Sequence, residues 1–231
     1  MKTPYGHLSY CSNIHTGEIW SEHFAQLKQH VPAVKAQVSP NQPMGLGLRF
    51  ANQASIDLQD PTELMALQSW LSEQNLYVFT LNGFPYGGFH NTIVKDQVHA
   101  PDWTTTERRD YTIRLAHILA ALLTENEGGI STSPLSYKYW WNTAEERSQA
   151  MRTSTQHLLE VVDVLAEIEK NTGKTIHIDI EPEPDGLLSN HSDFVAWYEQ
   201  VLLPAGNPDL IRRHVQLCFD ICHYGVSFDS P

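Results

Sequence analysis

The sequence is poor in cysteine, in basic residues and in long apolar runs. Its three cysteines, Cys11, Cys218 and Cys222, are too few and too scattered for a disulfide framework, which favours a reducing compartment. Lys and Arg number 15 against 27 Asp and Glu, a formal charge of −12, so the surface would repel a phosphate backbone. No apolar run approaches the roughly 18 residues that span a bilayer, and the N-terminus lacks an apolar signal core. We therefore expect a soluble, cytoplasmic protein with no membrane span and no nucleic-acid partner.

The composition is that of a folded domain with a large core. Hydrophobic residues make up 41% of the 231 residues and aromatic residues 10%, unlike a disordered chain. The length suits one α/β barrel, one large domain or two small ones. Because we find no internal repeat, low-complexity tract or boundary, we treat residues 1–231 as one domain.

Strand and helix patterns alternate along the chain. The predicted strands are 8–13, 44–50, 76–83, 129–134, 175–181 and 214–220, and the predicted helices cover 18–31, 143–171 and 194–203 and begin near 61 and 106. Asp60, Pro61 and Glu63 form a helix start with a capping box, and Gly173 is a helix stop. Six such alternations predict a parallel sheet, either doubly wound or closed into a barrel.

The periodicity within strands favours the barrel. The strand 175–181 alternates isoleucine with His177, Asp179 and Glu181, whereas strands covered by helices on both faces usually read as continuous apolar runs. One small or polar face per strand is typical of a barrel interior. The last inward residue of every strand is polar: Asn13, Arg49, Asn82, Ser133, Glu181 and Asp220. Since α/β-barrel sites are built at the C-terminal strand ends, we predict a (β/α)8 barrel with one shared site there.

Carboxylates and a histidine at the last two strand ends suggest a metal site. A carboxylate such as Glu181, at the mouth of an apolar strand, needs a cation or strong donors to stay charged. Asp220 and His223 add oxygen and nitrogen donors that suit a divalent ion such as Zn, Mn, Mg or Co. The alternatives are an ion pair of Glu181 with Arg49 and a surface-loop role for His223. Glu183 is a second acid/base group or a solvated loop residue, and the two later cysteines are best read as small buried hydrophobes.

Aromatic, glycine-rich loops follow the strands at the same end. The segment 82–90 (NGFPYGGFH) suits stacking on a sugar ring, and a second aromatic cluster lies at 137–141. Long loops in compact domains are usually functional or disordered, and this composition is too aromatic for disorder. Arg49 leaves room for a phosphate or carboxylate group on the ligand. The residues expected to bind a polyhydroxylated small molecule are Asn13, His15, Arg49, Asn82, Phe84, Tyr86, His90 and Ser133.

Several of these residues belong to motifs that resemble those of a known group of barrel proteins. The motif DICH at 220–223, with Glu181 ending the preceding strand, is similar to the xylose isomerase-like superfamily, which holds sugar and sugar-phosphate isomerases and epimerases and also endonuclease IV. The segments YCSNIHTGE (10–18), NGFPYGGFH (82–90), STSPLS (131–136) and EPEP (181–184) resemble the bacterial EboE metabolite traffic proteins. The resemblance covers essentially the whole chain. It implies a metal role for Glu181 and Asp220, and a substrate or metal role for His223.

The number of predicted strands departs from the pattern of this superfamily. The superfamily completes its metal site with residues from strands seven and eight, whereas this sequence ends soon after the sixth predicted strand. We therefore expect a barrel truncated after strand six, poorly stable and inactive in this form, because its sheet edges would be open.

Three functions fit these expectations. The first is a metal-assisted sugar or cyclitol isomerase or epimerase in secondary-metabolite handling, with Glu181 and Glu183 as catalytic carboxylates. The second is a non-catalytic binding or traffic protein on the same barrel. A further copy of the chain or other members of a metabolite traffic cluster are candidate partners. The third, an endonuclease IV-like phosphoesterase, is disfavoured by the charge of −12.

Overall fold

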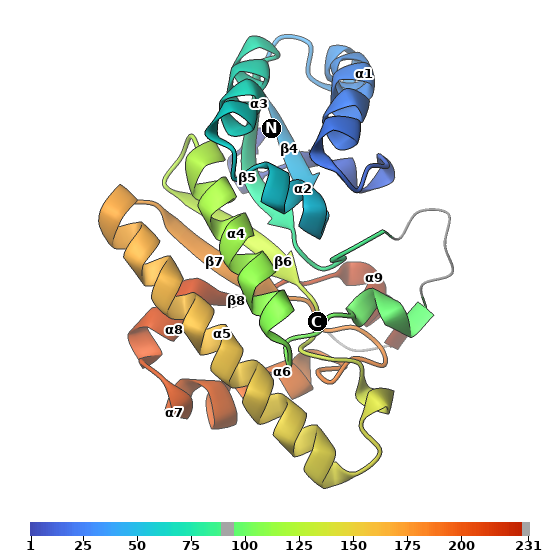
Figure 1. Cartoon of the computed structure of the whole chain (residues 1–231), viewed down its shortest axis with the longest axis vertical. Coiled ribbons are helices and arrows are strands. Elements are labelled where there is room, and N and C mark those ends of the chain that lie inside the picture. The colour runs from blue at the N-terminus through green and yellow to red at the C-terminus, as the bar shows by residue number, and fades with distance from the viewer. Residues whose placement is uncertain (89–94, 228–231) are drawn as a thin grey trace.

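The computed structural model describes residues 1–88 and 95–227 and is built on a six-stranded parallel sheet (Figure 1). The strands are β3 (Ser9–Cys11), β4 (Met44–Arg49), β5 (Leu76–Asn82), β6 (Glu127–Thr132), β7 (Thr175–Ile180) and β8 (Val215–Leu217). Their order in the sheet is their order in the chain, and every neighbouring pair is parallel. A doubly wound sheet reverses its strand order, whereas a barrel does not. The sheet thus has the arrangement of successive barrel units.

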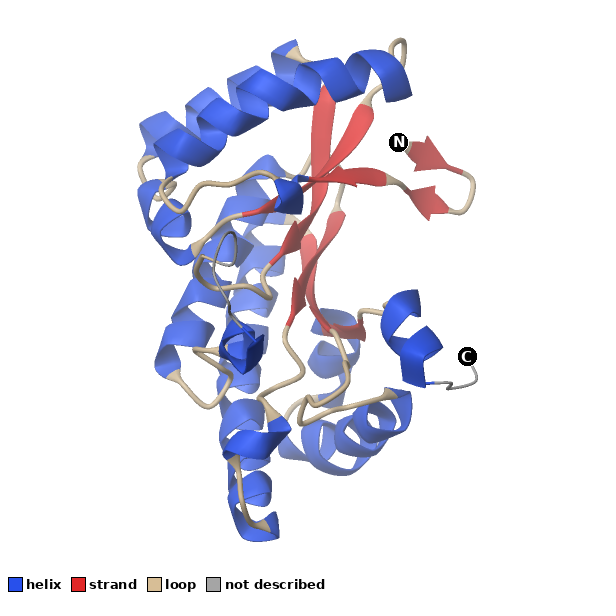
Figure 2. Ribbon diagram, turned by 90° about the vertical axis from the view of Figure 1, so that its right-hand side faces the viewer, coloured by secondary structure: helices blue, strands red, loops and turns tan. Residues whose placement is uncertain are grey.

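Helices connect the strands. They are α1 (Trp20–Val38), α2 (Asn52–Asp57), α3 (Pro61–Glu73), α4 (Thr106–Leu122), α5 (Ala144–Thr172), α6 (His191–Trp197), α7 (Leu203–Ala205), α8 (Pro208–His214) and α9 (Ile221–Ser227). Figure 2 shows the long helices gathered on one side of the sheet, with the hairpin of β1 (Lys2–Thr3) and β2 (Gly6–His7) and the C-terminal helix on the other. Within the described residues, no helix combines the length and the apolar character needed to cross a membrane.

The alternation predicted for β7 is present in the structure. Its three isoleucines are fully buried in the main core, whereas His177 and Asp179 on the opposite face are partly exposed. Helix α5 packs on the apolar side through Leu158, Val161 and Leu165, which are fully buried. The apolar face of the strand therefore meets the helices, and the polar face lines the inside of the curved sheet.

Two local predictions fail, one because of a side chain near the helix end and one because of a contact between helices. Helix α1 continues through Pro32 to Val38, because the buried Lys35 ammonium donates to the carbonyl oxygens of Ser39 and Gln42 and anchors its last turn. At the start of α3, Asp60 caps Thr62 as expected, but Glu63 accepts a hydrogen bond from Trp20 Nε1 (2.9 Å). A contact between helices thus replaces the capping box.

The sixth predicted strand is much shorter than expected. The sequence predicts an extended segment over residues 214–220, whereas β8 covers only Val215–Leu217. Helix α8, which the sequence reading missed, ends at His214 immediately before it, and α9 begins at Ile221. Likewise β3 ends at Cys11, so Asn13 lies on a 3-10 turn (Ser12–Ile14) and not on a strand. These short strands bring helices and turns directly to the C-terminal edge of the sheet.

Candidate functional site

Two consecutive β/α units bring Glu181, Asp220 and His223 together. Glu181 directly follows β7, and its N–H donates to the Thr132 carbonyl oxygen (3.0 Å), which extends the strand pairing by one residue. Asp220 Oδ1 accepts from the N–H of Cys222 (2.7 Å) at the start of α9. His223 lies three residues further along this short helix, so its side chain and that of Asp220 share a face. The site is therefore fixed by a strand end and a helix start.

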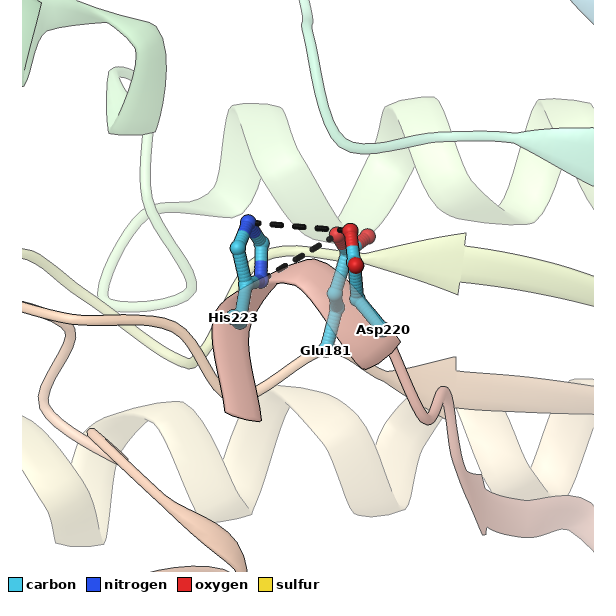
Figure 3. Close-up of side chains that lie close together, drawn as sticks. All are labelled: Glu181, Asp220 and His223. Atoms are coloured by element: carbon cyan, nitrogen blue, oxygen red, sulfur yellow. Dashed lines mark ion pairs between the residues drawn. The ribbon is translucent and has the colours of Figure 1, made fainter. Parts of the chain in front are cut away.

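Each of the three residues offers one donor atom within 4.8 Å of the others. His223 Nδ1 lies 3.8 Å from Glu181 Oε1, and His223 Nε2 lies 3.6 Å from Asp220 Oδ2. Figure 3 shows the two carboxylates next to each other, both facing the imidazole ring. All three side chains are partly buried, with exposed fractions of 15, 33 and 27% for Glu181, Asp220 and His223. The predicted ligands thus form one compact group.

The electrostatics of this group favour a cation. The pKa of Glu181 is raised to about 7: burial is the main cause, the positive charge of His223 opposes it, and the negative charges of Glu183 and Asp220 add to it. A positive ion between the carboxylates would relieve both effects. Two carboxylate oxygens and an imidazole nitrogen are donors that Zn, Mn and Co accept readily. The residues present therefore fit a divalent metal.

Glu183 lies beside this group and faces the same ring nitrogen of His223 as Asp220 does. Its Oε2 is 3.8 Å from His223 Nε2, and its Oε1 is 3.0 Å from Nε2 of His99. The His99 side chain is almost completely buried, at the end of a 3-10 helix (Lys95–His99). The sequence reading missed His99, because nothing in the spacing around it distinguishes it from the other histidines.

The two predicted aromatic loops converge on His99. The ring centroid of Phe84 lies 5.4 Å from that of His99, and those of Tyr137 and Trp140 lie at 5.3 and 6.3 Å. Asn82 ends β5 and accepts a hydrogen bond from the N–H of Phe84 (2.9 Å), which turns the chain into this loop. Phe84, Tyr137 and Trp140 therefore form an aromatic wall around His99, next to Glu183.

The other predicted ligand-binding residues lie in several environments. Tyr86 packs edge-on against Tyr111 (5.0 Å between centroids). His15 is buried and stacks on the ring of His30. Its Nε2 shares a hydrogen bond with the Tyr10 hydroxyl (3.0 Å). Ser133 follows β6 and is fully buried. His90 lies outside the described residues, and ligand contact by all of these side chains stays a prediction.

Arg49 is buried at the end of β4, next to Glu18 rather than in the ion pair with Glu181 considered above. Its guanidinium donates to the Gly87 carbonyl oxygen and lies 3.9 Å from Glu18 Oε1. Burial lowers the pKa of Arg49, while Tyr111 and Glu18 act in the opposite direction. The sequence predicts that the two later cysteines are buried, but Cys222 on α9 is exposed and Cys218, just after β8, is only partly buried.

Comparisons with known proteins locate the fold. No family model matches the chain, and a search of curated proteins finds no match. Among solved structures, it is similar to the crystal structure of the IolI protein with a bound zinc atom, with a TM-score of 0.53 and 13% sequence identity. The similarity covers 96% of this chain, which spans 66% of the length of that one. At this identity the likeness concerns the fold alone, and the chain has the parallel strand order of successive β/α units of an α/β barrel.

Proposed function

We propose that the chain binds a divalent metal at Glu181, Asp220 and His223 and acts there on a sugar or cyclitol, as an isomerase- or epimerase-like protein of secondary-metabolite handling. The observation that carries the proposal is the convergence of three donor atoms within 4.8 Å at the C-terminal strand ends, where barrel sites form. The similar fold of a protein crystallised with zinc supports it.

The chain's own residues have distinct tasks in this proposal. When bound, the cation would polarise a carbonyl or a pair of hydroxyls on the ligand. Glu181, Asp220 and His223 hold it, and the negative group formed by Glu181 and Asp220 keeps the site selective for cations. Glu183, next to His223, is the carboxylate that takes up and returns a proton.

The aromatic wall gives the site its ligand preference. Phe84, Tyr137 and Trp140 surround His99 beside Glu183 and carry apolar faces. Such faces pack against the C–H side of a sugar or cyclitol ring, while polar strand ends are left for its hydroxyl groups. A hydroxyl-rich ring therefore fits better than a flat apolar ligand or an extended peptide.

Metal content tests the first step. Elemental mass spectrometry should find about one divalent ion per chain in the wild type and none in the Glu181→Ala/Asp220→Ala variant. The matched control is Glu145→Ala/Asp209→Ala, which removes two carboxylates that are 84 and 94% exposed. Equal metal loss in both variants, or no metal in the wild type, would refute the site.

Hydrogen exchange of the ligand tests the chemistry. A panel of sugars and cyclitols is incubated with metal-loaded protein in D2O, and deuterium incorporation at carbon is followed by NMR. Glu183→Gln should abolish incorporation even at a metal concentration that saturates the variant, because it removes the proton acceptor.

A binding protein without turnover is the second candidate. It is favoured by the position of Glu183, whose two oxygens both face imidazole rings, at 3.0 Å from His99 and 3.8 Å from His223. A carboxylate engaged in this way is less available to move a proton. Saturation-transfer NMR signals from a cyclitol or sugar, without any deuterium incorporation, would support this traffic role in place of catalysis.

A further inference from the structure

The contact between His99 and Glu183 joins a buried histidine to the candidate metal centre. His99 is 3% exposed, and its Nε2 lies 3.0 Å from Glu183 Oε1. The other oxygen of the same carboxylate, Oε2, lies 3.8 Å from Nε2 of His223. Glu183 therefore bridges two imidazoles, one inside the aromatic wall and one in the metal group.

The His99 ring is held on several sides. Phe84 comes from the loop after β5, whereas Tyr137 and Trp140 come from the loop after β6. Trp140 Nε1 also donates to Asp96 Oδ2 (2.9 Å), in the 3-10 helix that carries His99. A ring packed in this way has a fixed orientation, so its Nε2 is directed at Glu183 without further loss of freedom.

The segment that carries Glu183 is fixed to the same wall by its backbone. Lys138 N–H donates to the Asp185 carbonyl oxygen (2.9 Å), and Leu187 N–H donates to that of Ser136 (2.7 Å). Tyr137 and Gly186 form an isolated antiparallel bridge between these two hydrogen bonds. The loops after β6 and β7 thus make one unit, and the carboxylate of Glu183 has a defined place between the two histidines.

We propose that His99 is a positioning residue that orients Glu183 toward His223 and thereby sets the affinity of the metal centre. Histidines that bind metals usually donate their second ring N–H to a carboxylate or carbonyl, which fixes the ring and makes it a better ligand. In His223 the Pro182 carbonyl oxygen faces Nδ1 in this way (3.3 Å), whereas Glu183 faces Nε2 beside Asp220. His99 Nε2, 3.0 Å from the other Glu183 oxygen, keeps the carboxylate at this place, where its negative charge strengthens cation binding. The inference rests on the proposed metal function and adds a residue outside the ligand set.

The test measures Co²⁺ affinity and the visible spectrum of the bound Co²⁺. His99→Phe keeps an aromatic ring in the wall but removes the donor, and should weaken Co²⁺ binding about 10- to 100-fold and shift the spectrum. His99→Gln retains an N–H donor and should restore most of the affinity. Glu183→Gln should weaken binding to a similar extent. The double variant should be no weaker than either single variant, because both act through one contact.

A second histidine provides the control. His157 on α5 is bonded through Nδ1 to the Trp103 carbonyl oxygen (2.8 Å) and is partly buried. His157→Phe should therefore leave Co²⁺ affinity and spectrum unchanged, even where it lowers the melting temperature of the metal-free protein.

The outcomes separate the two proposals. If the wild type binds no Co²⁺, the proposed metal function fails and the role of His99 fails with it. If the wild type binds Co²⁺ and His99→Phe and Glu183→Gln bind it equally well, only the role of His99 is overturned. Lower metal-free stability with unchanged affinity and spectrum would likewise assign His99 a structural role. Should His99→Phe not fold, Glu183→Gln takes the negative charge out of the same contact without disturbing the aromatic wall, and unchanged Co²⁺ affinity and spectrum in that variant would overturn the role of His99.

Discussion

At the scale of single residues, the structure depends on charged groups that are buried with defined partners. Arg108 is fully buried, and its guanidinium donates to the carbonyl oxygens of Gly83 (2.6 Å), Phe84 (2.8 Å) and Pro101 (2.8 Å). Burial lowers its pKa to about 10, against the effects of Tyr111, Asp102 and Tyr86. Arg108 therefore remains charged at neutral pH and fixes the loop after β5.

Replacing Arg108 should strongly destabilise the folded protein. Arg108→Met leaves three buried carbonyl oxygens without their donor, and at about 1 kcal/mol or more for each we expect a loss of about 3 kcal/mol in the free energy of unfolding. Urea denaturation measures it. Arg152→Met is the control, because Arg152 is 53% exposed and its ion pair with Glu145 contributes little. Equal stability of the two variants would contradict a structural role for Arg108.

His177 on β7 should make stability depend on pH. Burial by itself lowers its pKa, but the hydrogen bond to Asp179 Oδ1 (2.5 Å) and the charges of Asp179 and Glu127 outweigh burial, so the pKa is raised. The protonated ring thus stabilises the folded state. This stabilisation is complete below the unfolded pKa of about 6.5 and is lost as the pH rises through the raised folded value.

The measurement compares the wild type with His177→Gln. The difference in their free energies of unfolding should be larger at about pH 5.5 than at about pH 8.5. Asp179→Asn removes the dominant charge facing the ring, so it should bring the NMR titration midpoint of His177 down. A difference that grows with pH would show that the imidazole is bound in its neutral form.

At the scale of elements, local signals predict those boundaries that no distant contact overrides. Helix α5 begins with the Thr143–Glu146 capping box and ends at Gly173, whose φ of 72° suits glycine. Its start and end fall within one residue of those predicted from sequence. The capping box expected for α3 is absent, because Glu63 binds Trp20 of another helix. Capping motifs are decisive only where the side chain has no better partner elsewhere.

Side chains of β7 lie so close to β6 that only glycine fits at position 129. A methyl group added at Gly129 on β6 would overlap the Asp179 carboxylate and the His177 ring. Gly129→Ala should therefore cost about 1–3 kcal/mol in unfolding free energy. Gly225→Ala on α9 is the control, since nothing lies within 4 Å of its added Cβ. A Gly129→Ala variant as stable as the control would show that the inner face of the sheet can adjust.

At the scale of the whole molecule, the parallel sheet places the candidate metal ligands together at its C-terminal edge. The strands follow one another in chain order, so the segments after β7 and β8 lie next to each other although Glu181 and Asp220 are far apart in sequence. Among the described residues, the first and last strands of the sheet, β3 and β8, are not paired with each other. Helix α9, which follows β8, packs on the rest of the molecule through the buried Tyr224, which lies next to His191 of α6, and it carries the candidate ligand His223.

Metal binding should tighten this part of the molecule. A cation held by Glu181 and by Asp220 and His223 links β7 to α9, so backbone amide exchange in Ile221–Ser227 should slow when Zn²⁺ is added. Hydrogen–deuterium exchange with mass spectrometry measures the change. At about 100 times the dissociation constant, Zn²⁺ should also raise the free energy of unfolding by about 2.7 kcal/mol. Slower exchange in the Glu181→Ala/Asp220→Ala variant would place the ion elsewhere.

The sequence by itself determined the parallel α/β sheet and the candidate ligands. Alternation in Ile176–Ile180 and the polar residue after each strand are local signals, and parallel strands present their C-terminal ends at one edge, so Glu181 and Asp220 follow from the pattern alone. Only the tertiary structure decided that His99 contacts Glu183 and that Arg108 fixes the loop after β5. Both contacts join segments distant in the chain, and their residue types are equally compatible with an exposed position, so only packing in three dimensions could select them.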